Sequence, residues 1–248
     1  MAHFQQNEFV RILTTTLPEY FSGVRVLEVG SWSLHGSVRE YFSQCDYIGA
    51  DIAVGPGVDL ICQGQDIDKP TNTFDVVMSC ECFEHNRFWL ETFINMVRML
   101  KPGGLFILTC AAPGRIEHGT SRRQAESSLT AKHGFPDYYR NLSRSHFRKR
   151  LSLDDHFECY GFAVPHYYND LYFVGLKRIP HQLSGKCDRL WQVLDAARQI
   201  SLAPGASQWD RRKRLLLSTT SRVLDRMVGG RIYHSITFHM HRLVMRLA

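Results

Sequence analysis

Residues 24–51, VRVLEVGSWSLHGSVREYFSQCDYIGAD, constrain the fold of this chain more than any other stretch. A β-branched run stops at Gly30, a turn of small residues follows, residues 37–42 have helical spacing, and a second strand ends at Asp51. Asp51 comes 21 residues after Gly30, a distance that suits a carboxylate on the ribose of a nucleoside lying over the first turn. The stretch therefore predicts an α/β fold with a nucleoside cofactor.

The alternation of strands and helices continues to about residue 180. Helices are predicted at 4–21, 87–100 and 140–151, and further strands at 58–62, 74–81, 104–111, 156–164 and 170–178. Only PHYYN joins the last two strands, which permits an antiparallel pairing but not a parallel crossover. The predicted fold is a Rossmann-like, doubly wound, seven-stranded sheet that closes on an antiparallel β-hairpin. Polar residues 111–152 are expected to form an active-site insertion.

Several motifs in this region together resemble one known family. They are RVLEVGS, YIGAD, the acid in GQDID, FDVVMSCECFEH, MLKPGGLFILT and the terminal hairpin, in that order. Over about residues 20–180 the chain resembles a class I S-adenosylmethionine-dependent methyltransferase of the type-11 family. A nicotinamide dehydrogenase fits worse, because it would want G-x-G-x-x-G where this chain has GSWSLH. One departure from the methyltransferase pattern is that Trp32 and Leu34 stand where glycines are common.

The resemblance implies that residues near the strand ends hold S-adenosylmethionine. They are Glu28, Gly30, Ser31, Asp51, Ile52, Asp66, Ile67 and Glu81. Asp51 is expected to accept both ribose hydroxyls, because a carboxylate offers two acceptor oxygens to a vicinal diol. Asp66 is expected to accept the adenine amino group, with Asp68 as a competitor, and Glu28 to meet the amino-acid end of the cofactor.

Candidate residues for the acceptor side follow the fourth and fifth predicted strands. His118 and His85 are the predicted catalytic bases, since an imidazole titrates in the range that removal of a hydroxyl proton needs. Candidate acceptor-binding residues are Glu117, Tyr138, Tyr139 and His146. For both histidines a supporting, non-catalytic role is the alternative. No metal site is predicted, because Cys80-Glu-Cys82 lacks the second pair that a zinc site would need.

The positive charge of the chain lies in its last quarter. Residues 1–180, the predicted methyltransferase domain, carry 18 Lys and Arg against 20 Asp and Glu, while residues 181–248 carry 12 against 4. The first part therefore shows no excess of positive charge that would suit a nucleic-acid substrate. The second part is predicted to be a basic helical extension with three helices. It can pack on the domain, form a homodimer contact or lie on a membrane surface.

The cysteines and the start of the chain suggest a location. The seven cysteines are scattered and several fall in predicted strands, which favours reduced core thiols over a disulfide framework. We see no signal-peptide pattern at the start and no apolar run of about 18 residues. The expected location is cytoplasmic, with peripheral membrane attachment as the alternative.

The predicted function is methyl transfer from S-adenosylmethionine to a small-molecule acceptor. A hydroxyl of a sugar or other glycan-type metabolite is favoured over nitrogen or carbon acceptors. The alternatives are a non-catalytic nucleoside-binding or scaffold subunit, and a peripheral-membrane methyltransferase that acts on a lipid-linked substrate.

Overall fold

A seven-stranded sheet forms the centre of the computed structural model, which describes residues 4–33, 36–125, 128–200, 207–227, 236 and 240. The strands are β1 (Arg25–Val29), β2 (Asp46–Asp51), β3 (Leu60–Ile61), β4 (Phe74–Cys80), β5 (Leu100–Ala111), β6 (Phe157–Ala163) and β7 (Asp170–Lys177). Their order is β3-β2-β1-β4-β5-β7-β6. The first five run parallel, and β7 pairs antiparallel with both β5 and β6. The predicted fold class is confirmed.

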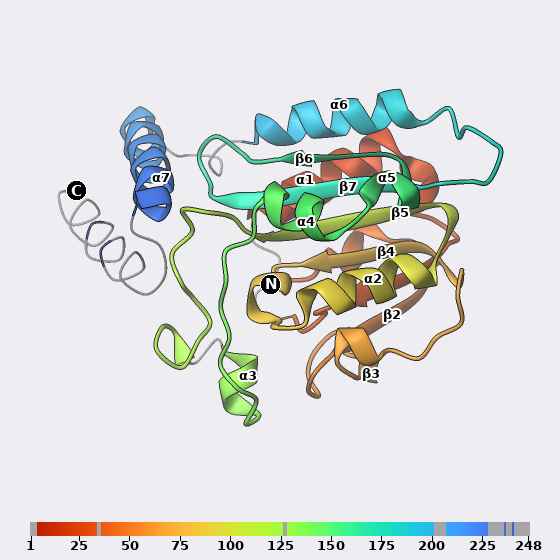
Figure 1. The fold of residues 1–248 in the computed structure, drawn as a ribbon, viewed down its shortest axis with the longest axis horizontal. Helices are drawn as coiled ribbons and strands as arrows, with labels where there is room; N and C mark the ends of the chain where they lie inside the picture. Colours follow the sequence, from red (N-terminus) through yellow and green to blue (C-terminus); the bar gives the residue numbers. More distant parts are fainter. Residues whose placement is uncertain are drawn as a thin grey trace.

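Helices cover both faces of this sheet (Figure 1). One face carries α1 (Phe4–Thr16) and α6 (Cys187–Arg198), and the other carries α2 (Trp89–Met99), α4 (Arg144–Arg150) and α5 (Leu153–His156). Alternate residues of β4 are buried on opposite faces of the sheet. Val76 and Met78 join the core on the α1 side, while Val77 joins the core on the α2 side. A parallel strand buried on both faces needs such a continuous apolar run.

The helix predicted at residues 37–42 is only one 3-10 turn, η2 (Val38–Tyr41). Ser37 caps this turn by accepting the N–H of Arg39. The chain then becomes extended at Phe42, whose ring packs against Phe21 and Tyr47 with centroid distances of 4.7 and 5.3 Å. Burial of Phe42 therefore ends the helix that the local pattern predicted. The strand predicted at 58–62 is likewise shorter, since β3 has two residues.

The C-terminal extension adds α6 and α7 (Gln208–Met227). The apolar side of α6 lies in the same core cluster as α1 and the sheet, through Leu190, Val193, Leu194 and Ala197. By contrast α7 lies at one end of the molecule, where Arg222 donates to Asn169 Oδ1 at 2.7 Å in the β6–β7 connection (Figure 1). The domain boundary at residue 180 stays a prediction, and the third predicted helix falls almost entirely outside the described residues. Among the described helices, none has the length and apolar character that a bilayer crossing requires.

Two of the cysteines are joined, contrary to the prediction of reduced thiols. A disulfide links Cys159 on β6 to Cys187 at the start of α6, with 5.8 Å between their Cα atoms. The other five are free, at positions 45, 62, 80, 82 and 110. The pairing follows from the packing of α6 on β6, a long-range contact that cysteine spacing does not reveal.

The disulfide leads to a prediction about stability. Because it joins residues 28 apart, we expect Cys187→Ser to lower the free energy of unfolding of the oxidised protein by about 3 kcal/mol. Urea unfolding with and without dithiothreitol measures this difference. The reductant should remove most of the difference between wild type and variant. Equal stability of the two proteins without reductant would show that the bond does not form.

Candidate cofactor and acceptor site

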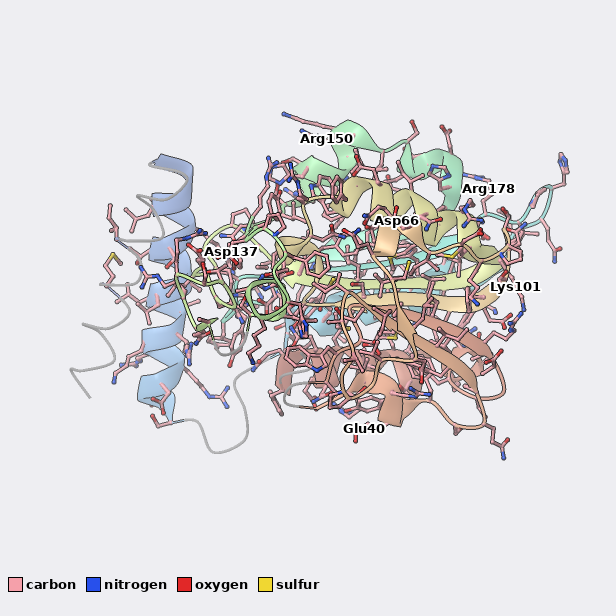
Figure 2. The ribbon with its side chains drawn as sticks, turned by 90° about the horizontal axis from the view of Figure 1, so that it is seen from below. Glu40, Asp66, Lys101, Asp137, Arg150 and Arg178 are labelled. Carbon is pink, nitrogen blue, oxygen red and sulfur yellow. A yellow bond between two sulfur atoms is a disulfide. The ribbon has the colours of Figure 1, made fainter. Side chains whose placement is uncertain are left out.

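A pocket of about 240 Å³ opens where the carboxyl ends of β1, β2 and β4 meet. Its sheet side is formed by Val29, Gly30, Ala50, Asp51, Glu81 and Cys82. The insertion forms the opposite wall, through Gly119, Leu129, Thr130, Phe135, Pro136 and Tyr138. Figure 2 shows Asp137 of the insertion at the end of the molecule nearer α7, and Lys101 at the opposite end of the sheet. Open α/β sheets bind ligands at the carboxyl ends of their strands.

Gly30 makes the turn after β1 and has a φ of +85°. Its N–H and that of Ser31 both donate to the carbonyl of Ala50, at 2.8 and 3.2 Å, which draws the turn over the end of β2. A Cβ at Gly30 would lie 2.4 Å from the Cβ of Cys82. The left-handed backbone and this close approach both require glycine, which leaves bare backbone in the pocket wall.

Asp51 ends β2 and lies in the pocket wall with two hydrogen bonds already made. Its Oδ2 accepts the N–H of Trp32 at 2.9 Å, and its Oδ1 accepts the N–H of Ile52 at 2.7 Å. Burial raises the pKa of Asp51, and these two N–H groups oppose the shift. A carboxylate has about four lone-pair positions, so one remains on each oxygen for a vicinal diol. Asp51 therefore fits a ribose.

Trp32, where glycine was expected, also lines the pocket. Its indole packs edge-on against Gly55, where an added Cβ would lie 2.1 Å from Trp32 Nε1. The Nζ atom of Lys132, on α3 (Leu129–Lys132), lies 5.5 Å from the indole centroid. The side chain thus connects the first turn to the insertion that covers the pocket.

Four predicted cofactor residues are not among those that line the pocket: Glu28, Ser31, Asp66 and Ile67. Asp66 is exposed, and its Oδ2 accepts the side-chain amides of Gln63 and Gln65 at 3.2 and 3.1 Å. These two glutamines line the pocket in its place. The 3-10 turn η3 (Gly64–Asp66) places the acid on the surface, outside the pocket lining, and its contact with adenine stays a prediction. Ser31 and Ile67 are buried behind the wall.

Glu28 is buried on the α1 side of β1, where its Oε2 accepts the hydroxyl of Tyr47 at 2.8 Å. Burial raises its pKa from the ordinary 4.5 to about 7, and the Tyr47 hydrogen bond opposes the shift. Glu28 therefore does not line the pocket, and any influence on the cofactor passes through β1.

The raised pKa of Glu28 predicts a dependence of stability on pH. Below pH 4.5 the carboxyl is protonated in both the folded and the unfolded chain, whereas between 4.5 and about 7 only the folded chain keeps the proton. Stability from this group is therefore lost as pH rises through that range, by about 3 kcal/mol in total. Glu28→Gln should match wild type near pH 4.5 and be the more stable protein near pH 8 in urea unfolding. A stability difference that stays constant with pH would contradict this account.

Comparison with known proteins identifies the family. A family model described as a methyltransferase domain matches residues 1–167. The chain belongs to this methyltransferase family. It is a class I methyltransferase, whose cofactor is S-adenosylmethionine. A comparison with curated protein sequences found no match.

Several solved structures are similar to this one at low sequence identity. Burkholderia thailandensis 1,6-didemethyltoxoflavin-N1-methyltransferase, with bound 1,6-didemethyltoxoflavin and S-adenosylhomocysteine, is 15% identical, with a TM-score of 0.50 over 71% of this chain and 79% of that one. Phosphoethanolamine N-methyltransferase 2 of Haemonchus contortus, in complex with S-adenosylmethionine, is 15% identical, with a TM-score of 0.49 and coverages of 70% and 53%. The CurJ carbon methyltransferase is 18% identical, with a TM-score of 0.47 and coverages of 67% and 51%.

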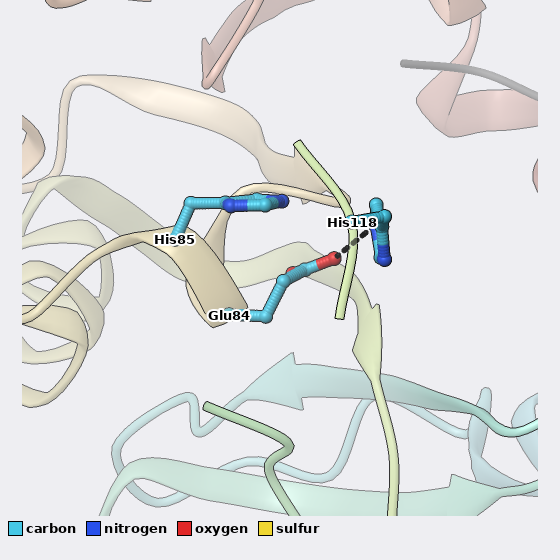
Figure 3. Close-up of side chains that lie close together, drawn as sticks. All are labelled: Glu84, His85 and His118. Atoms are coloured by element: carbon cyan, nitrogen blue, oxygen red, sulfur yellow. Dashed lines mark ion pairs between the residues drawn. The ribbon is translucent and has the colours of Figure 1, made fainter. Parts of the chain in front are cut away.

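Beside the pocket of the methyltransferase, residues that follow β4 and β5 form a cluster of titratable groups (Figure 3). Glu84 and His85 lie on η4 (Phe83–His85), and His118 lies in the insertion. Glu84 is 0% exposed, and its Oε1 lies 3.8 Å from His118 Nε2. The rings of His85 and His118 meet edge to face, 5.3 Å apart, and His85 also lines the pocket. The structure thus brings the two predicted bases together.

Further buried charges surround this cluster. Glu81, which follows β4, has a positive φ of 53° and accepts the hydroxyl of Thr109. Arg115 forms an ion pair of 3.1 Å with the fully buried Asp170. Burial, reinforced by the charge of Glu81, raises the pKa of Glu84 well above its ordinary range, while burial lowers the pKa of His85 to about 4. Sequence reasoning missed the Arg115–Asp170 pair, which only the β5–β7 pairing brings together.

The predicted acceptor-binding residues have separate positions. Tyr138 lines the pocket, and Tyr139 lies behind it, with its ring 5.2 Å from that of His118. Glu117 is buried and accepts the hydroxyl of Thr120. His146 is outside the pocket lining, contrary to the prediction, and its Nδ1 accepts the N–H of Ser143 at the start of α4. Its ring caps a helix, which the sequence pattern did not distinguish from a pocket position.

Proposed function

We propose that this methyltransferase transfers the methyl group of S-adenosylmethionine to a hydroxyl of a small acceptor, a sugar or other glycan-type metabolite. Methyl transfer is a displacement in which the cofactor supplies the leaving group, so the protein must position the acceptor and take up its proton. A neutral hydroxyl needs such a proton acceptor more than an amine does.

The observation that carries the proposal is the position of His85 in the wall of the cofactor pocket, with Glu84 and His118 directly behind it. Asp51 at the end of β2 occupies another part of the same wall. A cofactor whose ribose is held by Asp51 thus shares its pocket with groups able to accept a proton. The ring of Tyr138 adds an aromatic face of the kind on which sugars pack.

Labelled S-adenosylmethionine tests the proposal with a panel of sugars and sugar nucleotides. The matched controls are the same compounds with each hydroxyl already methylated, together with amine and carbon acceptors. We expect a labelled methyl ether on one hydroxyl and no product from the compound blocked there. Transfer to amine or carbon acceptors alone would overturn the hydroxyl assignment. Failure to bind S-adenosylhomocysteine would favour a non-catalytic subunit.

As a second candidate we propose that the acceptor is lipid-linked, because of the exposed side of α7. Arg212, Leu215, Leu216 and Val223 are exposed, at spacings that place them on one side of the helix. Basic helices with such apolar residues bind anionic membrane surfaces. We expect the protein to sediment with vesicles containing phosphatidylserine at low salt, and Leu215→Ser/Leu216→Ser to stay in the supernatant. Equal behaviour of both proteins would contradict this candidate.

A further inference from the structure

Three side chains of the types that bind metals converge beside the cofactor pocket. One carboxylate oxygen of Glu84, one ring nitrogen of His85 and one ring nitrogen of His118 all lie within 4.8 Å of one another. Figure 3 shows Glu84 and His85, both on η4, directed toward His118 from the insertion. Two imidazoles and one carboxylate are a ligand set used by zinc, iron and other divalent transition metals.

The burial of the Glu84 side chain favours a positively charged partner. Its side chain is 0% exposed, and neither carboxylate oxygen has a hydrogen bond within the described part of the chain. The His118 ring nitrogen at 3.8 Å is too far for a hydrogen bond. A fully buried carboxylate without donors is costly, and a bound ion is one way to offset that cost.

The tautomer of His118 suits a ligand. Its Nδ1 lies 3.0 Å from the carbonyl oxygen of Ile116 and 3.1 Å from the hydroxyl of Tyr139. A carbonyl only accepts, so Nδ1 carries the hydrogen and Nε2 presents its lone pair on the side of Glu84. Metal-binding histidines are commonly held in this way, with the second nitrogen donating to a carbonyl or carboxylate.

The surrounding charge also favours a cation. Glu81, Glu84 and Asp170 interact electrostatically in this region, and each also interacts with the guanidinium of Arg115. Arg115 pairs directly with Asp170. A divalent ion at Glu84 would add positive charge beside these carboxylates.

We propose that Glu84, His85 and His118 bind a divalent transition-metal ion whose open coordination positions face the pocket. Bonds of about 2.0–2.2 Å place ligand atoms roughly 3.0–3.5 Å apart, so a separation of up to 4.8 Å must close by as much as roughly 1.3–1.8 Å on binding. An ion here would bind an acceptor oxygen and lower the pKa of its hydroxyl, so that the proton could leave to solvent while the two histidines remain ligands. Activation of an acceptor hydroxyl by the ion rests on the proposed function. Binding of the ion does not.

Metal binding is measured without acceptor or cofactor. Protein dialysed against EDTA and then against buffer is titrated with Co²⁺, followed by visible absorption, and with Zn²⁺, followed by calorimetry. We expect one ion per chain. Glu84→Gln and His118→Gln should each weaken binding by about 100-fold or more, and Tyr139→Phe by about tenfold, because it removes only an outer partner.

The matched control is His146→Gln, since His146 caps α4 outside the pocket. It should bind Co²⁺ as wild type does, and circular dichroism checks that every variant is folded. Wild-type protein that takes up no ion overturns the proposal without relying on any variant. If His146→Gln and His118→Gln lose the same Co²⁺ affinity, the proposal is overturned too, because the ion then binds to surface histidines.

A separate experiment distinguishes the metal from the methyl transfer. Calorimetry with S-adenosylhomocysteine, and labelled transfer to hydroxyl acceptors, are repeated with metal-free and Zn²⁺-loaded wild type. Equal cofactor affinity with at least tenfold slower transfer in the metal-free protein supports a role for the ion at the acceptor. Full transfer without metal overturns that role while leaving hydroxyl methylation intact.

Discussion

Asp51→Ala is expected to weaken the binding of S-adenosylhomocysteine by two to three orders of magnitude. The carboxylate lies in the pocket wall with a free lone pair on each oxygen, so it can accept both hydroxyls of a ribose. Hydrogen bonds to a charged group contribute about 1.5–3 kcal/mol each, and 1.4 kcal/mol corresponds to a factor of ten. Isothermal titration calorimetry measures the affinity directly. Asp51→Asn, which keeps one acceptor oxygen, should fall between wild type and Asp51→Ala.

The control for this prediction is Asp59→Ala. The carboxylate of Asp59 accepts the N–H of Gly49 at 2.8 Å on the same strand, β2, and pairs with Arg39, but it does not line the pocket. Its loss removes a similar backbone contact without touching the proposed ribose site. The ribose assignment fails if Asp59→Ala weakens binding as much as Asp51→Ala, or if Asp51→Ala binds as wild type.

The fold was predictable where the chain is periodic over short distances. The apolar run of β4 and the five-residue connection before β7 each determine a strand or a pairing locally. The shortened turn η2 was not predictable in this way, because Phe42 leaves the helix to pack on Phe21 and Tyr47. The Cys159–Cys187 bond depends on how α6 docks on β6, which is a tertiary contact.

In the site too, residues placed by local sequence were predictable, and residues placed by tertiary contacts were not. Gly30 and Asp51 belong to one strand–turn–strand unit, so their spacing placed both in the pocket wall. The outward position of Asp66 depends on a single 3-10 turn that brings Gln63 and Gln65 to the pocket, and residue type alone favoured the acid. The juxtaposition of Glu84 with His118 joins segments that follow different strands, and only the folded insertion creates it.

The fold leaves the acceptor undetermined, for a physical reason. A fold does not specify what binds to it, and in this chain the pocket wall opposite the strand ends is formed by residues of the insertion such as Gly119 and Tyr138. Acceptor chemistry must therefore be argued from the insertion and from the cluster that contains His118.

Gly30→Ala should lower the free energy of unfolding by about 3 kcal/mol or more and also abolish cofactor binding. Two costs add at this position. The φ of +85° disfavours any L side chain by about 1–2 kcal/mol, and the new Cβ would lie 2.4 Å from Cys82 Cβ and 2.7 Å from its Sγ. Gly30 and Cys82 both line the pocket, so relief of the clash must move backbone in the wall of the proposed cofactor site. Urea unfolding and calorimetry with S-adenosylhomocysteine measure the two effects.

Gly23→Ala separates the two costs. Gly23 has a similar φ of +67°, but an added Cβ would meet no atom within 4 Å, so this variant should lose only about 1–2 kcal/mol and bind the cofactor normally. Cys82→Gly removes the opposing Cβ, and a double-mutant cycle with Gly30→Ala should recover most of the loss that exceeds the Gly23→Ala value. If Gly30→Ala costs no more than Gly23→Ala, or if Cys82→Gly restores nothing, the close approach of the two turns is not what requires glycine. Recovery of stability without recovery of binding would instead mean that the cofactor itself needs the space above Gly30.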